Sequence, residues 1–193
     1  MMTLVDITDP GLLILPAHRL IRGLPPSAIN KLLPGLKTFF DVDEVRLDDG
    51  DTNKQIDKLL SGKTATVQIV LYGLKKDSLH LLELHDFSGI APMMPHFHSE
   101  LYQKLDVSIV NHVILEELLG IEHDKTAQHL DYRNNASDAI NAVSENEYQL
   151  AVLLNPVRPE VIKAIADSGD RMPRKSTYFY PKTPTGLVFY RFG

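Results

Sequence analysis

The sequence predicts an α+β fold with one mixed, mainly antiparallel β-sheet, helices packed on it, and a C-terminal β-hairpin. Three observations predict this fold. Runs that favour strands and runs with helical spacing of apolar residues are mixed without strict strand–helix alternation. Residues 64–72 and 78–85 flank a short loop, as the strands of a hairpin do. Residues 177–180 and 187–192 are rich in aromatic side chains and flank a turn sequence that contains Pro and Gly.

The first elements are predicted to be a hairpin and a helix. Residues 2–7 and 12–16 favour strands, and Pro10-Gly11 between them indicates a turn. Residues 25–40 carry apolar side chains at helical spacing, and Pro34 is expected to kink or shorten that helix. We then expect a half-exposed strand at residues 42–47 and a short helix at 56–60 that ends near Gly62. The two hairpin strands follow at 64–72 and 78–85, and a surface loop at 86–98.

The second half of the chain predicts alternating helices and strands. Residues 99–119 form the longest segment with helical spacing, which ends at Gly120. We then expect a strand at residues 130–134 and a helix at 136–143 that is capped by Asn135 or Ser137. A buried central strand at 150–154 and a helix at 159–169, which ends at Gly169, follow.

Composition restricts the functional class. The 193 residues are 44% hydrophobic, carry a net charge of −5 and are expected to fold as a single domain over residues 1–193. Zero cysteines exclude thiol catalysis, thiolate metal sites and disulfides. No apolar run reaches membrane-spanning length, there is no signal-peptide pattern, and the acidic balance argues against a nucleic-acid partner. These features predict a cytoplasmic protein. The chain begins inside a predicted strand, so we expect it to be the C-terminal part of a longer protein.

A cationic segment near the C-terminus is the first candidate site. From Arg171 onward there are five basic residues and no acidic one, so a tail of +5 follows a body of −10. Arg171, Lys175, Ser176 and Thr177 lie close together in this tail, and such guanidinium, ammonium and hydroxyl groups suit a phosphate or a carboxylate. The alternative is a solvated loop whose cations balance the acidic body and a helix C-terminus.

A second candidate cluster lies near the N-terminus, at His18, Arg19 and Arg22. An imidazole beside a guanidinium can act as a general acid or base next to an anion. It can equally form a polar sheet edge with the imidazole bonded to the backbone. His96 and His98 supply only two possible zinc ligands, so no metal ligand is assigned. The sequence leaves the cofactor unknown. The sequence has no phosphate-binding or dinucleotide-binding glycine motif.

Several segments, taken in order, resemble one known family. The prokaryotic "domain of unknown function 1015" family is similar to this chain at residues 16–24, 105–121, 154–156 and 171–188. The last range carries the most specific run, Arg171-Met172-Pro173-Arg174-Lys175-Ser176-Thr177. Members are typically longer, and their N-terminal half carries an Asp-Gly-His-His-Arg signature similar to that of ParB-like proteins and free-serine kinases. That signature is absent here. The resemblance therefore implies that this chain corresponds to the C-terminal part of the family.

Two functional hypotheses remain open. In the first, the chain is the anion-binding side of a phosphoryl-transfer enzyme for a phosphorylated small molecule or nucleotide, and it is inactive without the missing N-terminal half. His18 is the predicted catalytic residue, and the predicted anion-binding residues are Arg19, Arg22, Asn155, Arg171, Lys175, Ser176 and Thr177. This hypothesis expects His18 and Lys175 to face one open pocket. In the second, the aromatic C-terminal hairpin is a docking or oligomerisation surface without catalysis.

Overall fold

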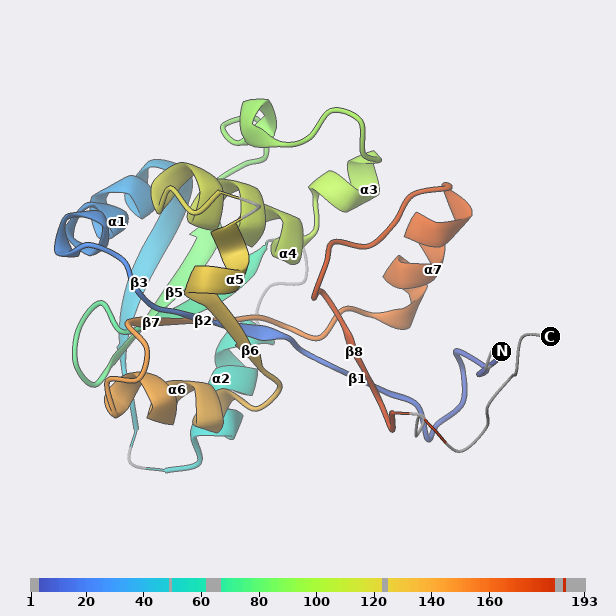
Figure 1. Cartoon of the computed structure of the whole chain (residues 1–193), viewed down its shortest axis with the longest axis horizontal. Helices are drawn as coiled ribbons and strands as arrows, with labels where there is room; N and C mark the ends of the chain where they lie inside the picture. Colours follow the sequence, from blue (N-terminus) through green and yellow to red (C-terminus); the bar gives the residue numbers. More distant parts are fainter. Residues whose placement is uncertain (1–3, 49, 62–66, 123–124, 183–185, 187–193) are drawn as a thin grey trace.

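The computed structural model describes residues 4–48, 50–61, 67–122, 125–182 and 186. A six-stranded sheet is covered by helices on both faces, and a separate two-stranded sheet extends from this body (Figure 1). Every strand pairing in the described residues is antiparallel. The predicted α+β class with a mainly antiparallel sheet is confirmed.

The order of the strands explains where the core lies. The sheet runs β3 (Phe40–Arg46), β5 (Ser78–Leu84), β4 (Gln68–Tyr72), β7 (Leu150–Leu153), β2 (His18–Ile21) and β6 (Leu130–Arg133). The predicted hairpin is confirmed, because β4 pairs with β5 from Gln68–Glu83 to Tyr72–Leu79. β7 is an inner strand with all four residues buried, as its continuous apolar sequence predicts.

Helix α1 (Pro26–Phe39), α4 (Asp106–Ile109) and the π-helix η2 (Val110–Leu118) cover one face of the sheet. α1 continues through Pro34 for 14 residues, with Leu32 and Leu36 fully buried. It packs closely on η2: a Cβ placed on Gly35 would lie 2.8 Å from a methyl group of Leu118.

Two capped helices cover the other face. The Asp51 side chain accepts from Lys54 N at the start of α2 (Thr52–Leu60), and the Asn135 side chain accepts from Asp138 N at the start of α6 (Ala136–Ser144). Asn135 is therefore the cap, one of the two predicted. Leu20 of β2 packs among the residues of this second core.

The single helix predicted over residues 99–119 is wrong. The segment divides into α3 (Glu100–Gln103), α4 and η2, because Leu105 has extended backbone angles between α3 and α4. This break lets Tyr102 and Leu105 both reach the core, while Leu101 is left exposed. Periodicity alone cannot locate such a break, since the apolar spacing continues across it.

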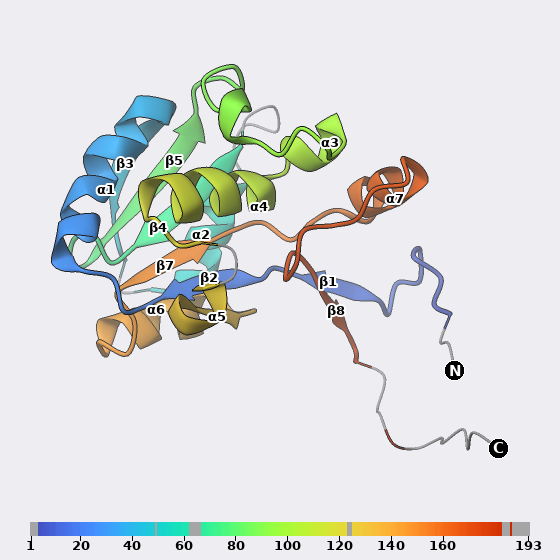
Figure 2. The same ribbon diagram turned by 45° about the horizontal axis from the view of Figure 1, so that its top comes forward.

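The predicted opening hairpin is also wrong. Residues 4–12 form turns, and β1 (Leu13–Leu15) pairs with β8 (Tyr178–Tyr180) from the far end of the chain. Together with α7 (Pro159–Asp167), these strands form an arm beside the six-stranded sheet (Figure 2). The predicted partner strand at 187–192 lies outside the described residues. Two short helices complete the fold: η1 (Ala91–Met93) and α5 (Thr126–His129).

None of the helices in the described part of the chain is long and apolar enough to cross a membrane.

Candidate functional site

A cavity of about 650 Å³ lies where the body meets the segment after α7. The body contributes side chains from η2, α5 and β6, and the arm contributes five consecutive residues. The lining consists of His98, Tyr102, Asn111, His112, Leu115, Glu116, Ile121, Thr126, Ala127, Leu130, Tyr132, Arg171, Met172, Pro173, Arg174 and Lys175. Its volume falls within the range of roughly 300–1,000 Å³ that is typical of small-molecule sites.

The π-helix supplies the wall on the body side. Leu119 N donates to Ile114 O, a bond that spans five residues and widens the helix by comparison with an α-helix. Asn111, His112 and Glu116 all project from η2 into the cavity lining. His112 Nδ1 lies 2.8 Å from Glu116 Oε2, so these two side chains orient each other.

The opposite wall is cationic. Arg171, Arg174 and Lys175 line the cavity together, whereas Glu116 is the one carboxylate among its lining residues. Lys175 has a φ of 56°, which is uncommon for a residue with a side chain and is typical of tightly constrained sites. Its Nζ lies 5.8 Å from the ring centre of Tyr132 on β6. The cavity is therefore suited to an anion.

Asp170 holds this cationic segment against the body. Its Oδ2 accepts from Ser99 N at 2.7 Å, and its Oδ1 accepts from Arg171 N and lies 2.7 Å from His98 Nδ1. Although burial alone would raise the pKa of Asp170, these hydrogen bonds hold it well below its usual range. The His98 ring in turn stacks on Tyr102, with ring centres 3.7 Å apart.

Arg19 lies directly behind the body wall. It is 1% exposed, its Nη1 donates to Ala17 O at 2.8 Å, and its Nη2 donates to Asn111 Oδ1 at 3.4 Å. Its guanidinium carbon lies 6.0 Å from the Tyr132 ring centre. Burial lowers the pKa of Arg19, and the nearby Tyr132 and Asp106 oppose that shift. Burial raises the pKa of Asp106. The hydrogen bond from Val107 N and the positive charge of Arg19 act in the opposite direction and lower it.

Most of the buried polar atoms without a hydrogen-bond partner belong to Arg19 and to the α4–η2 segment. Among the described residues these atoms are Arg19 Nε, His80 Nδ1, Ser108 Oγ and His112 Nε2. Three of the four belong to Arg19 or to the α4–η2 segment. Such groups are rare in folded proteins and commonly mark functional sites, because an unpaired buried polar group destabilises the fold.

His18 lies on the other face of the sheet. Successive residues of a strand point to opposite faces, and Leu20 packs with α2 and α6 while Ile21 packs with α1 and η2. His18 therefore shares the α2–α6 face, whereas Arg19 shares the face of η2. His18 Nδ1 accepts from Leu154 N at 3.2 Å, and burial, aided by the Arg19 charge, lowers the pKa of His18 to about 4. It is a neutral, backbone-bonded residue that does not line the cavity.

The other predicted residues are dispersed. Arg22 pairs with Asp131 at 3.5 Å and lies over the Tyr148 ring, while Asn155 Nδ2 donates to Leu60 O at 2.9 Å. Ser176 is buried, Thr177 is half-buried, and neither lines the cavity.

The structure thus brings Arg171 and Lys175 together in one cavity and places Arg19 behind it. Sequence reasoning missed Asn111, His112, Glu116 and Tyr132 as lining residues. One signal points to the first three: they are polar positions in a mainly apolar helical segment, although Glu117, also polar, does not line the cavity.

The two histidines considered for zinc are not joined by a third suitable residue in the part of the chain that the structure describes. His98 is engaged with Asp170, and the described part of the chain holds no cluster of three or more residues suited to a metal ion.

Comparison with known proteins identifies the family. The model of a family described as "Protein of unknown function (DUF1015)" matches residues 1–108, which is more than half of the chain. The chain belongs to the DUF1015 family. The matched region includes Arg19 and ends within α4, so the cationic segment of this DUF1015 protein lies beyond it. No curated protein sequence matches the chain.

Two solved structures align with the chain at low identity. A conserved hypothetical protein from Pyrococcus furiosus aligns over 93% of this chain and 61% of its own, with 16% identity and a TM-score of 0.49. A free serine kinase in complex with AMP aligns over 91% of this chain and 56% of its own, with 14% identity and a TM-score of 0.46. The chain thus spans less than two thirds of either structure.

Proposed function

We propose that the cavity binds the phosphate group of a small molecule or nucleotide, and that this chain is the anion-binding side of a phosphoryl-transfer enzyme. One observation carries the proposal: Arg171, Arg174 and Lys175 line a single cavity of about 650 Å³ on a wall opposite η2. Guanidinium and ammonium groups form charge-assisted hydrogen bonds with phosphate oxygens, which are stronger than bonds between neutral groups.

The remainder of the lining suits the rest of such a ligand. Leu115, Ile121 and Met172 provide apolar surface beside the cations, as is usual in pockets for nucleotide-sized molecules. In phosphoryl transfer the protein mainly positions the phosphate and stabilises its charge, so cationic residues contribute without acting as nucleophiles. The catalytic role of His18 stays a prediction that the strand register does not support.

Isothermal titration calorimetry with inorganic phosphate, AMP and ADP tests the proposal. We expect Lys175→Ala and Arg174→Ala each to weaken binding about tenfold, because a hydrogen bond to a charged group is lost. Lys31→Ala is the matched control: it removes an exposed cation of α1 that does not line the cavity. Absence of binding by the unaltered protein at millimolar ligand would overturn the proposal, as would equal weakening by Lys31→Ala.

A docking role is the second candidate, and one observation favours it. Leu13 and Tyr180 are partners in the β1–β8 sheet, and each is 50% exposed. Exposed apolar side chains on a projecting strand pair suit a protein contact. If the protein self-associates through them, Leu13→Ser with Tyr180→Ser shifts its sedimentation coefficient to that of a monomer. A monomeric unaltered protein would count against self-association by this surface.

A further inference from the structure

We infer that Asn111 is a ligand-binding residue whose side-chain amide is oriented by the buried Arg19, so that its NH₂ group donates to an anionic oxygen in the cavity. The inference rests on the proposed function, which supplies the anion. Asn111 lies on η2, is partly buried and lines the cavity wall that faces the cationic segment.

The hydrogen-bond inventory determines which way the amide points. A guanidinium has only donors, so the Asn111 atom that faces Arg19 Nη2, at 3.4 Å, is the acceptor Oδ1. The two N–H donors of the same planar amide then point away from Arg19. Since Asn111 is held between Arg19 and the cavity, these donors are presented toward a bound ligand.

The position of Arg19 explains why this orientation is constant. Its Nη1 is bonded to Ala17 O at 2.8 Å, and the residue lies in β2, between β7 and β6. A fully buried guanidinium on an inner strand of the sheet cannot change its conformation as an exposed arginine does. Asn111 is likewise fixed by its place near the start of the π-helix.

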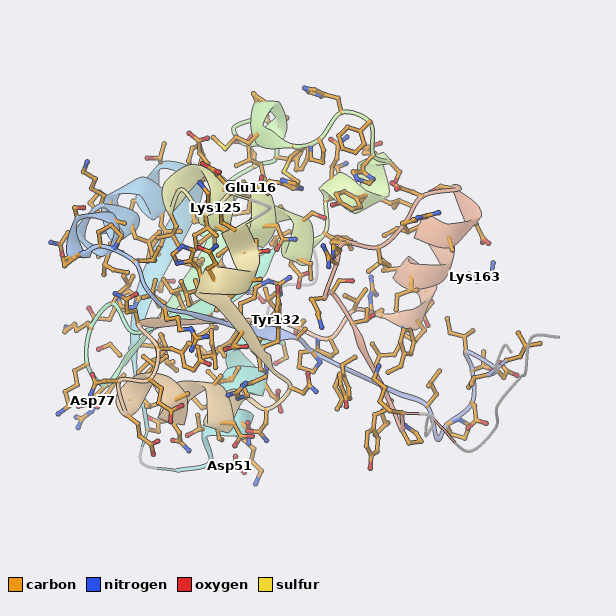
Figure 3. All side chains as sticks on the ribbon, in the orientation of Figure 1. Asp51, Asp77, Glu116, Lys125, Tyr132 and Lys163 are labelled. Carbon is orange, nitrogen blue, oxygen red and sulfur yellow. The ribbon has the colours of Figure 1, made fainter. Side chains whose placement is uncertain are left out.

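Charge also favours an anion at this point. Asp106 is the carboxylate whose charge acts on Arg19, but no ion pair among the described residues involves Arg19, and its Nε has no hydrogen-bond partner. A buried guanidinium whose charge is only partly balanced destabilises a protein, and an anion bound next to Asn111 would offset part of that cost. Tyr132, labelled in Figure 3, is near both cations that would share this anion: its ring centre is 6.0 Å from the Arg19 guanidinium carbon and 5.8 Å from Lys175 Nζ.

Asn111→Asp is the most direct test, with ADP and inorganic phosphate as probes in calorimetry and the melting temperature measured in parallel. Aspartate keeps the size of the side chain and gives Arg19 a charged partner, so the melting temperature should stay equal or rise. The donors are replaced by a negative charge that faces the ligand, so affinity should fall about 30-fold or more. Asn141→Asp is the control, because it makes the same charge change at an exposed position on α6, which covers the opposite face.

A double-mutant cycle tests the orienting role of Arg19. Asn111→Ala should weaken binding about tenfold, and Arg19→Lys, which keeps the charge but loses the planar fork, should weaken it as well. If Arg19 acts through Asn111, Arg19→Lys has little further effect once Asn111 is alanine. Melting temperatures identify any variant that fails to fold, and Asn111→Ala then carries the test alone.

The outcomes separate this inference from the proposed function. If Lys175→Ala weakens binding but Asn111→Asp and Asn111→Ala bind as the unaltered protein does, the inference is wrong and the proposed function stands. If the unaltered protein binds none of the probes, the proposed function fails first. Loss of affinity in Asn111→Asp, with normal binding by Asn141→Asp, supports the inference.

Discussion

The backbone N–H of Ser99 donates to Oδ2 of Asp170 at 2.7 Å, and this bond joins the start of α3 to the segment after α7. The same carboxylate also receives Arg171 N. α3 and α7 lie side by side in both ribbon views (Figures 1 and 2). One partly buried acid therefore holds the cationic wall of the cavity in place.

Asp170→Ala is expected to lower the free energy of unfolding by about 2–3 kcal/mol, because backbone donors lose a charged acceptor. It should also weaken binding of phosphate, since Arg171 is no longer held. Chemical denaturation measures the first effect and calorimetry the second. Asp167→Ala is the control: this exposed carboxylate pairs with Lys163 on the surface of α7, and its loss should cost less than about 1 kcal/mol. Equal stability of the two variants would contradict the prediction.

His18 is expected to make the protein acid-labile. Its pKa is about 4 in the folded protein against 6.5 when exposed, so the unfolded chain takes up the proton first as the pH falls. The stability that neutral His18 provides is fully present above pH 6.5 and is lost progressively down to pH 4, by about 3 kcal/mol in total.

Denaturation at a series of pH values measures this loss, with His18→Asn as the comparison. Asparagine keeps an acceptor for Leu154 N and does not titrate, so the slope between pH 6.5 and pH 4 should become shallower. Burial also lowers the pKa of His80, so part of the slope should remain in that variant. An unchanged slope in His18→Asn would show that His18 is not responsible.

Gly73→Ala is expected to destabilise the turn between β4 and β5. Gly73 has a φ of 111°, and a Cβ there would lie 2.3 Å from Gln149 O, so the backbone would have to move. The cost should be about 2 kcal/mol or more. Gly89→Ala is the control, since its added Cβ meets nothing within 4 Å and should change the free energy of unfolding by less than about 0.5 kcal/mol. A similar effect of both substitutions in thermal denaturation would refute this account.

Asn155→Ala separates a structural role from a ligand-binding role. Asn155 Nδ2 donates to Leu60 O at the end of α2, so the variant should lose about 1 kcal/mol of stability. Its affinity for phosphate should not change, because Asn155 does not line the cavity. Asn30→Ala, at an exposed position of α1, should change neither quantity. Weaker phosphate binding by Asn155→Ala alone would instead restore the ligand-binding role that the sequence predicts.

Local patterns predicted most of the individual elements. Apolar residues recur at helical spacing in α1, α2, α6 and α7. This spacing involves residues that are near one another in the chain, and all four helices are present in the fold. The β4–β5 hairpin follows from two short runs and a short loop. Asn135 was recognisable as a cap because its side chain bonds a backbone N–H only three residues away.

The candidate site was only partly predictable. Arg171 and Lys175 are conspicuous in sequence because they are close together in a tail without acids. Arg19 was selected as well, but its role differs from that of its neighbour His18, because the alternation of a strand sends the two side chains to opposite faces. No local pattern links Arg19 to Asn111, which is 92 positions away.

The sequence by itself determined the α+β class, the helices and the inner strand β7, since each depends on interactions among residues that are near in the chain. Only the tertiary structure decided that β1 pairs with β8, that the long apolar segment breaks at Leu105, and that the cations of the tail face η2 across one cavity. The physical reason is the same in all three cases. These arrangements are selected by packing and hydrogen bonding between distant segments, whose partners are not encoded in the spacing of neighbouring residues.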